Sequence, residues 1–194
     1  MTTLTASPVA ARENRVLADR LGGTIAREIA LVAAGTIAMI VLARISIPLP
    51  FTPVPVSLGP LGALSVGTTL GARRGLASVA TYAILGVAGA PVFTGTNVGW
   101  AFPSFGYILG YLLVAAIAGL AAQRGADRRI VTMAPTAVVS LFSVYIAGLA
   151  WMIPFAHMTL EQGLMKGFVP FIIGDLVKAA VATGVFPVLR SIFR

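Results

Sequence analysis

The chain has 194 residues, of which 58% are hydrophobic and 10% charged, and its mean hydropathy is +0.95, whereas soluble domains carry about 25% charged residues, so the composition indicates an integral membrane protein. Cysteine is absent and histidine occurs once, which excludes disulfides, thiol catalysis and multi-histidine metal sites. The net charge of +8 and the pI of 11.1 are also typical of nucleic-acid-binding proteins, a class that the placement of the charges disfavours below.

The polar residues 1–23 are expected to form a cytoplasmic tail, and the first spanning helix is expected over about residues 24–47. Residues 48–60 follow and contain five prolines. Proline lacks a backbone N–H and disfavours helix at the residue before it, so this segment is predicted to be extended or turning. Because it is also apolar, it is either a lid over a pocket or a plain connector held against the helices.

The remainder of the chain contains charge-free runs of 28 and 49 residues, at 45–72 and 75–123. About 20 apolar residues cross a bilayer, so the longer run can hold two spans. We predict one all-α membrane domain over residues 24–194 with six transmembrane helices. The later spans are expected at 56–70, 76–87, 104–122, 130–153 and 167–189, joined by a basic turn at 71–75, an uncharged glycine-rich loop at 86–106, a basic loop at 123–129 and a polar loop at 154–166.

Basic residues in short loops set the orientation of a membrane protein. If both termini are cytoplasmic, 11 of the 14 basic residues lie on the cytoplasmic side, Arg44 and Lys166 lie outside, and Lys178 lies within the last span. The sequence therefore predicts two cytoplasmic termini. The high pI is explained by this topology, and nucleic acid is not an expected partner.

Two ionisable residues, Asp175 and Lys178, lie inside the last apolar span. A charge at the centre of a spanning helix costs about 2.5–3.5 kcal/mol, and a spacing of three residues places both on one helix face. Counted along one helix from Gly167, Asp175 is expected roughly 12 Å below the external end. The pair is either a site for a polar solute, a proton relay or a structural ion pair between helices.

Other candidates are weaker when taken alone. Asn97 in the glycine-rich loop is either a ligand or a turn residue. The aromatic residues Phe93, Trp100 and Tyr107 are either interface anchors or walls of a pocket for a small cyclic ligand. Small residues repeat every four positions along the first span and indicate either intramolecular packing or a docking surface for another membrane subunit; these are Ala26, Ala30, Ala34 and Ala38.

The phosphate-binding loop of ATPases is missing from the sequence. Its pattern ends in Lys-Ser or Lys-Thr, but the two lysines precede Gly167 and Ala179. If transport is driven by ATP, the ATPase is therefore another chain. No Ser/His/Asp set, metal cluster or dinucleotide fingerprint occurs either, so an enzyme is not expected.

Several motifs together resemble the BioY family, the substrate-binding membrane subunits (S components) of energy-coupling factor vitamin importers. They are residues 47–59 (IPLPFTPVPVSLG), 71–75 (GARRG), 82–93 (YAILGVAGAPVF), the pair Gly106-Tyr107 and residues 174–178 (GDLVK). The sequence departs from the family at residues 102–106 (FPSFG), where a stretch richer in glycine is common.

The resemblance implies a six-helix S component in a bacterial or archaeal-type cell membrane that captures biotin from outside, with residues 48–60 as lid and no cofactor. It also implies a transmembrane coupling subunit and two cytosolic ATPases as partners, docked through Ala30, Ala34 and Ala38. Biotin's ureido group has two N–H donors and a carbonyl acceptor. Asp175 can accept, Lys178 can donate and Asn97 can do either.

Phe93, Trp100 and Tyr107 are then walls for the apolar part of biotin, and either Lys178 or Arg44 is the cation for its carboxylate. One rival hypothesis is a self-sufficient secondary transporter in which Asp175 titrates and couples uptake to protons. A purely structural subunit is a second rival. An ATPase and a coupling subunit that are encoded next to this chain or that co-purify with it would favour the importer.

Overall fold

The computed structural model describes residues 16, 18 and 24–192, and most of this part of the chain is helical. The tail expected at residues 1–23 lies outside the described residues except for Val16 and Ala18, which are buried against Ala122. The helices are α2 (Ile25–Arg44), α3 (Gly59–Leu70), α4 (Ala72–Val87), α5 (Phe105–Gln123), α6 (Ile130–Phe142), α7 (Val144–Phe155), α8 (Leu160–Gly167) and α9 (Ile172–Ile192), with 3₁₀ turns η2 (Ala126–Arg128) and η3 (Val169–Phe171) and strands β1 (Ser46–Ile47) and β2 (Val56–Ser57).

Four helical segments are long and apolar enough to cross a membrane: Ile25–Arg44, Phe105–Gln123, Ile130–Phe155 and Leu160–Ile192. The helices α3 and α4 have 12 and 16 residues and are short for a span, as the sequence suggested for this region. Residues 24–192 thus fold into six helical segments, the number predicted.

A small β-ribbon shifts the predicted end of the first span and the predicted start of the second. Strand β1 pairs with β2 in antiparallel fashion, with Ser46 opposite Ser57 and Ile47 opposite Val56. Helix α2 therefore ends at Arg44 and α3 begins at Gly59, and the proline-rich residues form the tip of the ribbon. The predicted basic turn also shrinks, because Gly71 alone turns the chain with φ +84°, a conformation that glycine adopts without a steric cost.

The last two predicted spans are interrupted. The fifth changes from α6 to α7 at Ser143, and the expected polar loop at 154–166 contains α8, which begins with a capping box between Thr159 and Gln162. Helix α9 begins only at Ile172, after η3. Asp175 therefore lies in the first turn of α9, and the depth counted along one continuous helix from Gly167 was wrong.

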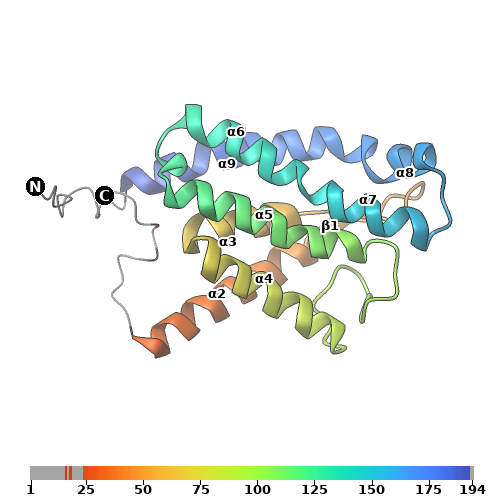
Figure 1. The fold of residues 1–194 in the computed structure, drawn as a ribbon, viewed down its shortest axis with the longest axis horizontal. Helices are drawn as coiled ribbons and strands as arrows, with labels where there is room; N and C mark the ends of the chain where they lie inside the picture. The colour runs from red at the N-terminus through yellow and green to blue at the C-terminus, as the bar shows by residue number, and fades with distance from the viewer. Residues whose placement is uncertain (1–15, 17, 19–23, 193–194) are drawn as a thin grey trace, which may run out of the picture.

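Helix α5 is the centre of the bundle, with α6 and α9 on one side and α4 and α2 on the other (Figure 1). Of its most apolar 18-residue stretch, 61% is buried, whereas the value for α2 is 17%. Small residues allow this close packing. A Cβ on Gly67 of α3 would lie 2.5 Å from the carbonyl oxygen of Ala115, and one on Gly110 would lie 2.6 Å from that of Val144.

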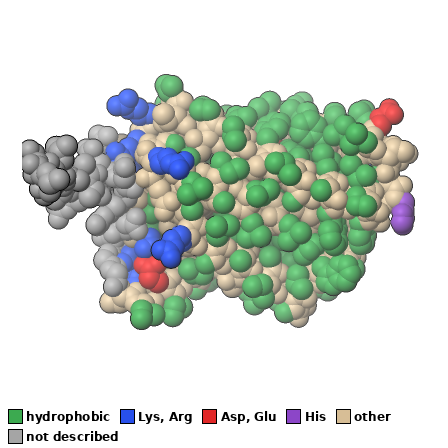
Figure 2. Space-filling view, in the orientation of Figure 1, with side chains coloured by type: hydrophobic (Ala, Val, Ile, Leu, Met, Phe, Trp, Pro, Cys, Tyr) green, Lys and Arg blue, Asp and Glu red, His purple; other side chains and the backbone are tan. Residues whose placement is uncertain are grey.

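Lys and Arg side chains gather at one end of the molecule, and hydrophobic side chains cover the middle (Figure 2). We call this the basic end; α2 begins there and α9 ends there (Figure 1). The loop between α4 and α5, the tip of the ribbon and α8 lie at the opposite end, which we call the loop end. Exposed Ile37, Ile84 and Val139 belong to the apolar belt between them.

Candidate functional site

A buried polar network joins α7 to the first turns of α9. The ammonium of Lys178 donates to Oδ1 of Asp175 at 2.7 Å, and the hydroxyl of Tyr145 donates to Oδ2 of the same carboxylate. Asp175 is 2% exposed and Lys178 is 7% exposed. Both carboxylate oxygens thus have a partner, while the ammonium uses one of its three N–H donors in this contact.

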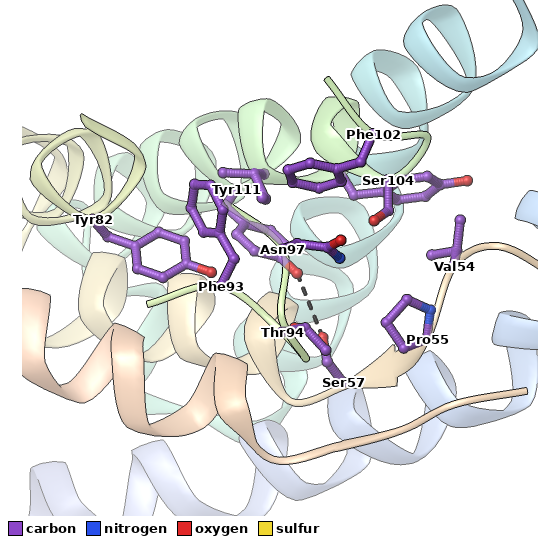
Figure 3. Close-up of a pocket in the computed structure, with 12 residues that line it drawn as sticks. Val54, Pro55, Ser57, Tyr82, Phe93, Thr94, Asn97, Phe102, Ser104 and Tyr111 are labelled. Carbon is purple, nitrogen blue, oxygen red and sulfur yellow. Dashed lines mark hydrogen bonds between the residues drawn. The ribbon is translucent and has the colours of Figure 1, made fainter. Parts of the chain in front are cut away.

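Two small cavities lie side by side beneath the tip of the ribbon. The first includes Asn97 in its wall, and the second includes Asp175 and Lys178. The walls that they share come from the ribbon and from α5: Val54, Pro55, Ser57, Tyr107 and Tyr111. Figure 3 shows the first cavity, with the rings of Tyr82, Phe93 and Phe102 around the amide of Asn97.

Each cavity has a volume of about 30 Å³. That is room for one or two water molecules, whereas pockets for small-molecule ligands measure about 300–1,000 Å³. The structure is therefore closed over the polar network. A vitamin-sized ligand can enter only if the shared walls move apart and the two cavities join.

The shared wall consists largely of two tyrosines one helical turn apart on α5. Tyr107 donates to the carbonyl oxygen of Gly167 at 2.7 Å, and the hydroxyl of Tyr111 lies 3.5 Å from Oγ of Ser57 (Figure 3). Gly148 leaves space for the first ring, since a Cβ there would lie 2.6 Å from it. These two side chains stand between the amide in the first cavity and the charges in the second.

The ribbon tip covers both cavities. Val54 and Pro55 line each of them, and the hydroxyl of Thr52 donates to the carbonyl oxygen of Lys166 at 2.6 Å. This bond ties the tip to the end of α8. Among the described residues, this is the one side-chain hydrogen bond between residues 48–55 and α8.

The other residues that the sequence singled out are divided between the cavity walls and positions outside them. The guanidinium of Arg44 donates to the carbonyl oxygen of Pro91 at 2.6 Å and is outside both cavity walls. Trp100 is 56% exposed and packs against Trp151, with ring centroids 6.2 Å apart. Phe93 and Tyr107 do line the first cavity. Among the described residues, no group of three or more His, Cys, Asp or Glu side chains could hold a metal ion.

Sequence reasoning missed Tyr111, Tyr145 and Ser57. The spacing of Tyr107 and Tyr111 was a usable signal, because residues four apart share one helix face and both are polar within an apolar span. Tyr145 gave no local signal, since its partner Asp175 is 30 positions away.

The fold matches a solved membrane subunit. The structure aligns with the crystal structure of the S component for biotin from an ECF-type ABC transporter, with a TM-score of 0.74 and 25% identity, covering 88% of this chain and 95% of that one. The helical bundle, the ribbon-covered cavities and the buried charges thus define a protein of the S-component class.

The model of the BioY family matches residues 10–194, so the chain belongs to the BioY family, as its motifs suggested. It is 35% identical over 160 residues to a probable biotin transporter of Pyrococcus horikoshii, covering 81% of this chain and 92% of the relative. It is 30% identical over 155 residues to a biotin transporter of Thermotoga maritima, covering 78% and 90%. The family and these relatives are transporters and not enzymes.

Proposed function

We propose that this chain captures biotin at the external face of the cell membrane and is the substrate-binding subunit of an ATP-driven importer. The names of its relatives support biotin as the ligand. The observation that carries the proposal is the buried Tyr145–Asp175–Lys178 network at the wall of a closed cavity. Charges buried in an apolar bundle are costly unless they are paired, and here they border a space that a ligand can enlarge.

In this proposal the ureido group of biotin lies at the charged pair. The carboxylate of Asp175 accepts from the ureido N–H groups, and the ammonium of Lys178 donates to the ureido oxygen. When the two cavities join, Asn97 borders the same space and contributes from the opposite side. The aromatic rings of Phe93 and Tyr107 then pack against the apolar part of the ligand.

The bond from Thr52 to α8 supports the role of the ribbon tip as a lid. Opening it breaks one hydrogen bond and moves Val54 and Pro55 from both cavities. The position of Arg44 favours a role in holding the 91–93 backbone over direct contact with the carboxylate of biotin.

Energy for release is supplied by partner chains. Ala30 and Ala34 are exposed on α2, the least buried of the four long segments, which suits docking of a transmembrane coupling subunit and, through it, two ATPases. We place the basic end and both termini in the cytoplasm because basic residues collect on that side of membrane proteins. Residues 1–23 are then the cytoplasmic tail and 24–194 the membrane domain.

Equilibrium binding of labelled biotin to the purified chain tests the ligand and the site. We expect tight binding to the wild type and strong losses in Asp175→Ala and Lys178→Ala, because each leaves a buried charge without its partner. An analogue without the ureido N–H groups is expected to bind much more weakly. Near-wild-type affinity in both variants would refute the site.

Reconstitution tests the source of energy. We expect proteoliposomes that contain this chain alone to take up no biotin when a pH gradient is imposed, and uptake to begin when the coupling subunit, the ATPases and ATP are supplied. Uptake by the chain alone under a pH gradient would instead establish a proton-coupled secondary transporter.

A further inference from the structure

A larger hollow lies on the outer surface between α2 and α4. It shares no lining residue with the two cavities. Its volume is about 580 Å³, and it is lined mainly by apolar side chains. The two helices cross (Figure 1) at Gly35 and Ser78, where a Cβ on the glycine would lie 2.4 Å from Oγ of the serine. The residues of the groove are Glu28, Ile29, Val32, Ala33, Thr36, Ile37, Ile40, Thr81 and Leu85.

The hydroxyls at this groove are satisfied within the protein. Thr36 donates to the carbonyl oxygen of Val32 at 2.9 Å, and Ser78 beneath it donates to that of Arg74 at 2.9 Å. Thr81 donates to the carbonyl oxygen of Ala77 at 2.8 Å. An occupant made of hydrocarbon therefore leaves none of these three donors unpaired, which is the condition for burial in lipid.

The dimensions of the groove fit one hydrocarbon chain. Its α2 wall runs from Glu28 to Ile40, a rise of about 18 Å at 1.5 Å per residue, close to the roughly 15 Å depth of one leaflet. Dividing the volume by this length gives a cross-section of about 32 Å², less than half of the roughly 80 Å² of a helix about 10 Å across. A partner helix is too wide to lie inside it.

The groove opens at the basic end beside a cluster of charges. Glu28 at its mouth accepts from Nε and Nη2 of Arg74 at 2.6 and 2.7 Å. Arg27 and the exposed Arg73 lie in the first turns of the same two helices. Among the described residues, these three positive charges and one negative charge leave a net charge of +2 at the mouth, which complements an anionic headgroup.

We infer that this groove is a binding site for an anionic phospholipid of the leaflet at the basic end, with one acyl chain between α2 and α4 and the phosphate near Arg73. The site is separate from the biotin cavities. Ala30, Ala34 and Ala38 do not line it.

Native mass spectrometry of the purified chain tests the site. The protein is mixed with equal amounts of phosphatidylglycerol and phosphatidylcholine that carry identical acyl chains, and the retained lipids are counted. We expect the wild type to retain one phosphatidylglycerol in preference. Ala33→Phe fills the groove and is expected to reduce retention about tenfold, the effect of losing about two buried methylenes. The matched control Ala180→Phe adds the same ring at an exposed position of α9, outside the groove, and is expected to leave lipid retention unchanged.

A second pair of variants tests the headgroup. Arg73→Gln is expected to reduce the preference for phosphatidylglycerol about fivefold, the contribution of one basic residue near an anionic surface. Arg124→Gln, in the turn that follows α5, is expected to leave the preference unchanged. Thermal unfolding confirms that each variant is folded. Equal lipid retention in Ala33→Phe and Ala180→Phe, or no preference between the two lipids, would overturn the inference. So would loss of a co-purifying coupling subunit from Ala33→Phe with lipid retention intact.

Discussion

At the level of single residues, Asp175 is the organising side chain of the site. It is buried, it accepts from an ammonium and a phenol, and it lies where α9 begins. A buried ion pair is often no more stable than a hydrophobic replacement, so stability alone does not explain this one. Its position at the wall of a cavity supports the proposed role in binding, in which a ligand shares its hydrogen bonds.

Tyr145 is expected to contribute to affinity by fixing the orientation of this carboxylate. Tyr145→Phe removes the hydroxyl and keeps the ring. Since a hydrogen bond to a charged group contributes about 1.5–3 kcal/mol, we expect the dissociation constant for biotin to rise about ten- to a hundredfold in calorimetric titration. Unchanged affinity would mean that Asp175 is held in place without this phenol.

The two aromatic residues of the 93–100 loop are expected to differ. Phe93 is 1% exposed and lines the first cavity, while Trp100 is 56% exposed and lies outside both cavity walls. We expect Phe93→Ala to weaken binding strongly, because truncating a buried Phe lowers folding stability by about 3–5 kcal/mol and so disturbs the cavity wall. We expect Trp100→Ala to leave binding nearly unchanged. The reverse order in a binding assay would show that the loop rearranges around the ligand.

At the level of elements, the connection between η2 and α9 holds a second buried ion pair. Nε of Arg190 lies 3.6 Å from Oδ2 of Asp127, and both residues are buried. Burial raises the pKa of Asp127 above its usual 3.8, and Arg190 opposes this rise. The folded protein therefore keeps this proton to a higher pH than the unfolded chain does, so the contribution of Asp127 to stability falls as the pH rises from 3.8 through the pKa of the folded state.

Asp127→Asn removes this titration. We expect the melting temperature of the wild type, relative to that of the variant, to fall as the pH is raised from 4 towards neutrality. Thermal unfolding in detergent at several pH values measures it. A difference in melting temperature between wild type and variant that stays constant or grows with pH would contradict the raised pKa of Asp127.

The ribbon tip is expected to control how fast biotin leaves. Thr52→Val removes the hydrogen bond to the carbonyl oxygen of Lys166, and a net contribution of about 0.5–1.5 kcal/mol predicts release about two- to tenfold faster. The control Thr136→Val removes a hydrogen bond within α6 and is expected to leave release unchanged. Equal dissociation rates for both variants in a chase with unlabelled biotin would exclude a latch at Thr52.

The sequence predicted the number of helical segments, because long apolar runs and basic loops are local signals. It also indicated the short second and third segments, α3 and α4. It did not predict β1 and β2, since two-residue strands depend on pairing between Ser46 and Ser57. The break before α9 was missed because η3 lies inside an apolar run, and Tyr145 was missed because only the tertiary fold brings α7 to Asp175.

At the level of the whole molecule, the two ends differ in the residues and elements that they contain. Arginines collect at the basic end, and the ribbon, the glycine-rich loop and α8 surround the cavities at the loop end. Helix α9 connects them, with Asp175 and Lys178 near its start and Arg190 near its finish. Helix α9 thus contributes residues to both buried ion pairs, Asp175 and Lys178 to one and Arg190 to the other.

The most direct test combines binding with stability in the charged pair. The single variants Asp175→Asn and Lys178→Met each leave one buried charge without its counter-charge. Each is expected to lose about 3–5 kcal/mol of folding stability. The double variant has no unpaired charge and is expected to recover most of that stability. Calorimetric titration of the folded double variant should then show biotin binding at least about a hundredfold weaker than in the wild type, from the loss of charge-assisted hydrogen bonds. A stable double variant that binds biotin as tightly as the wild type would contradict the proposed site.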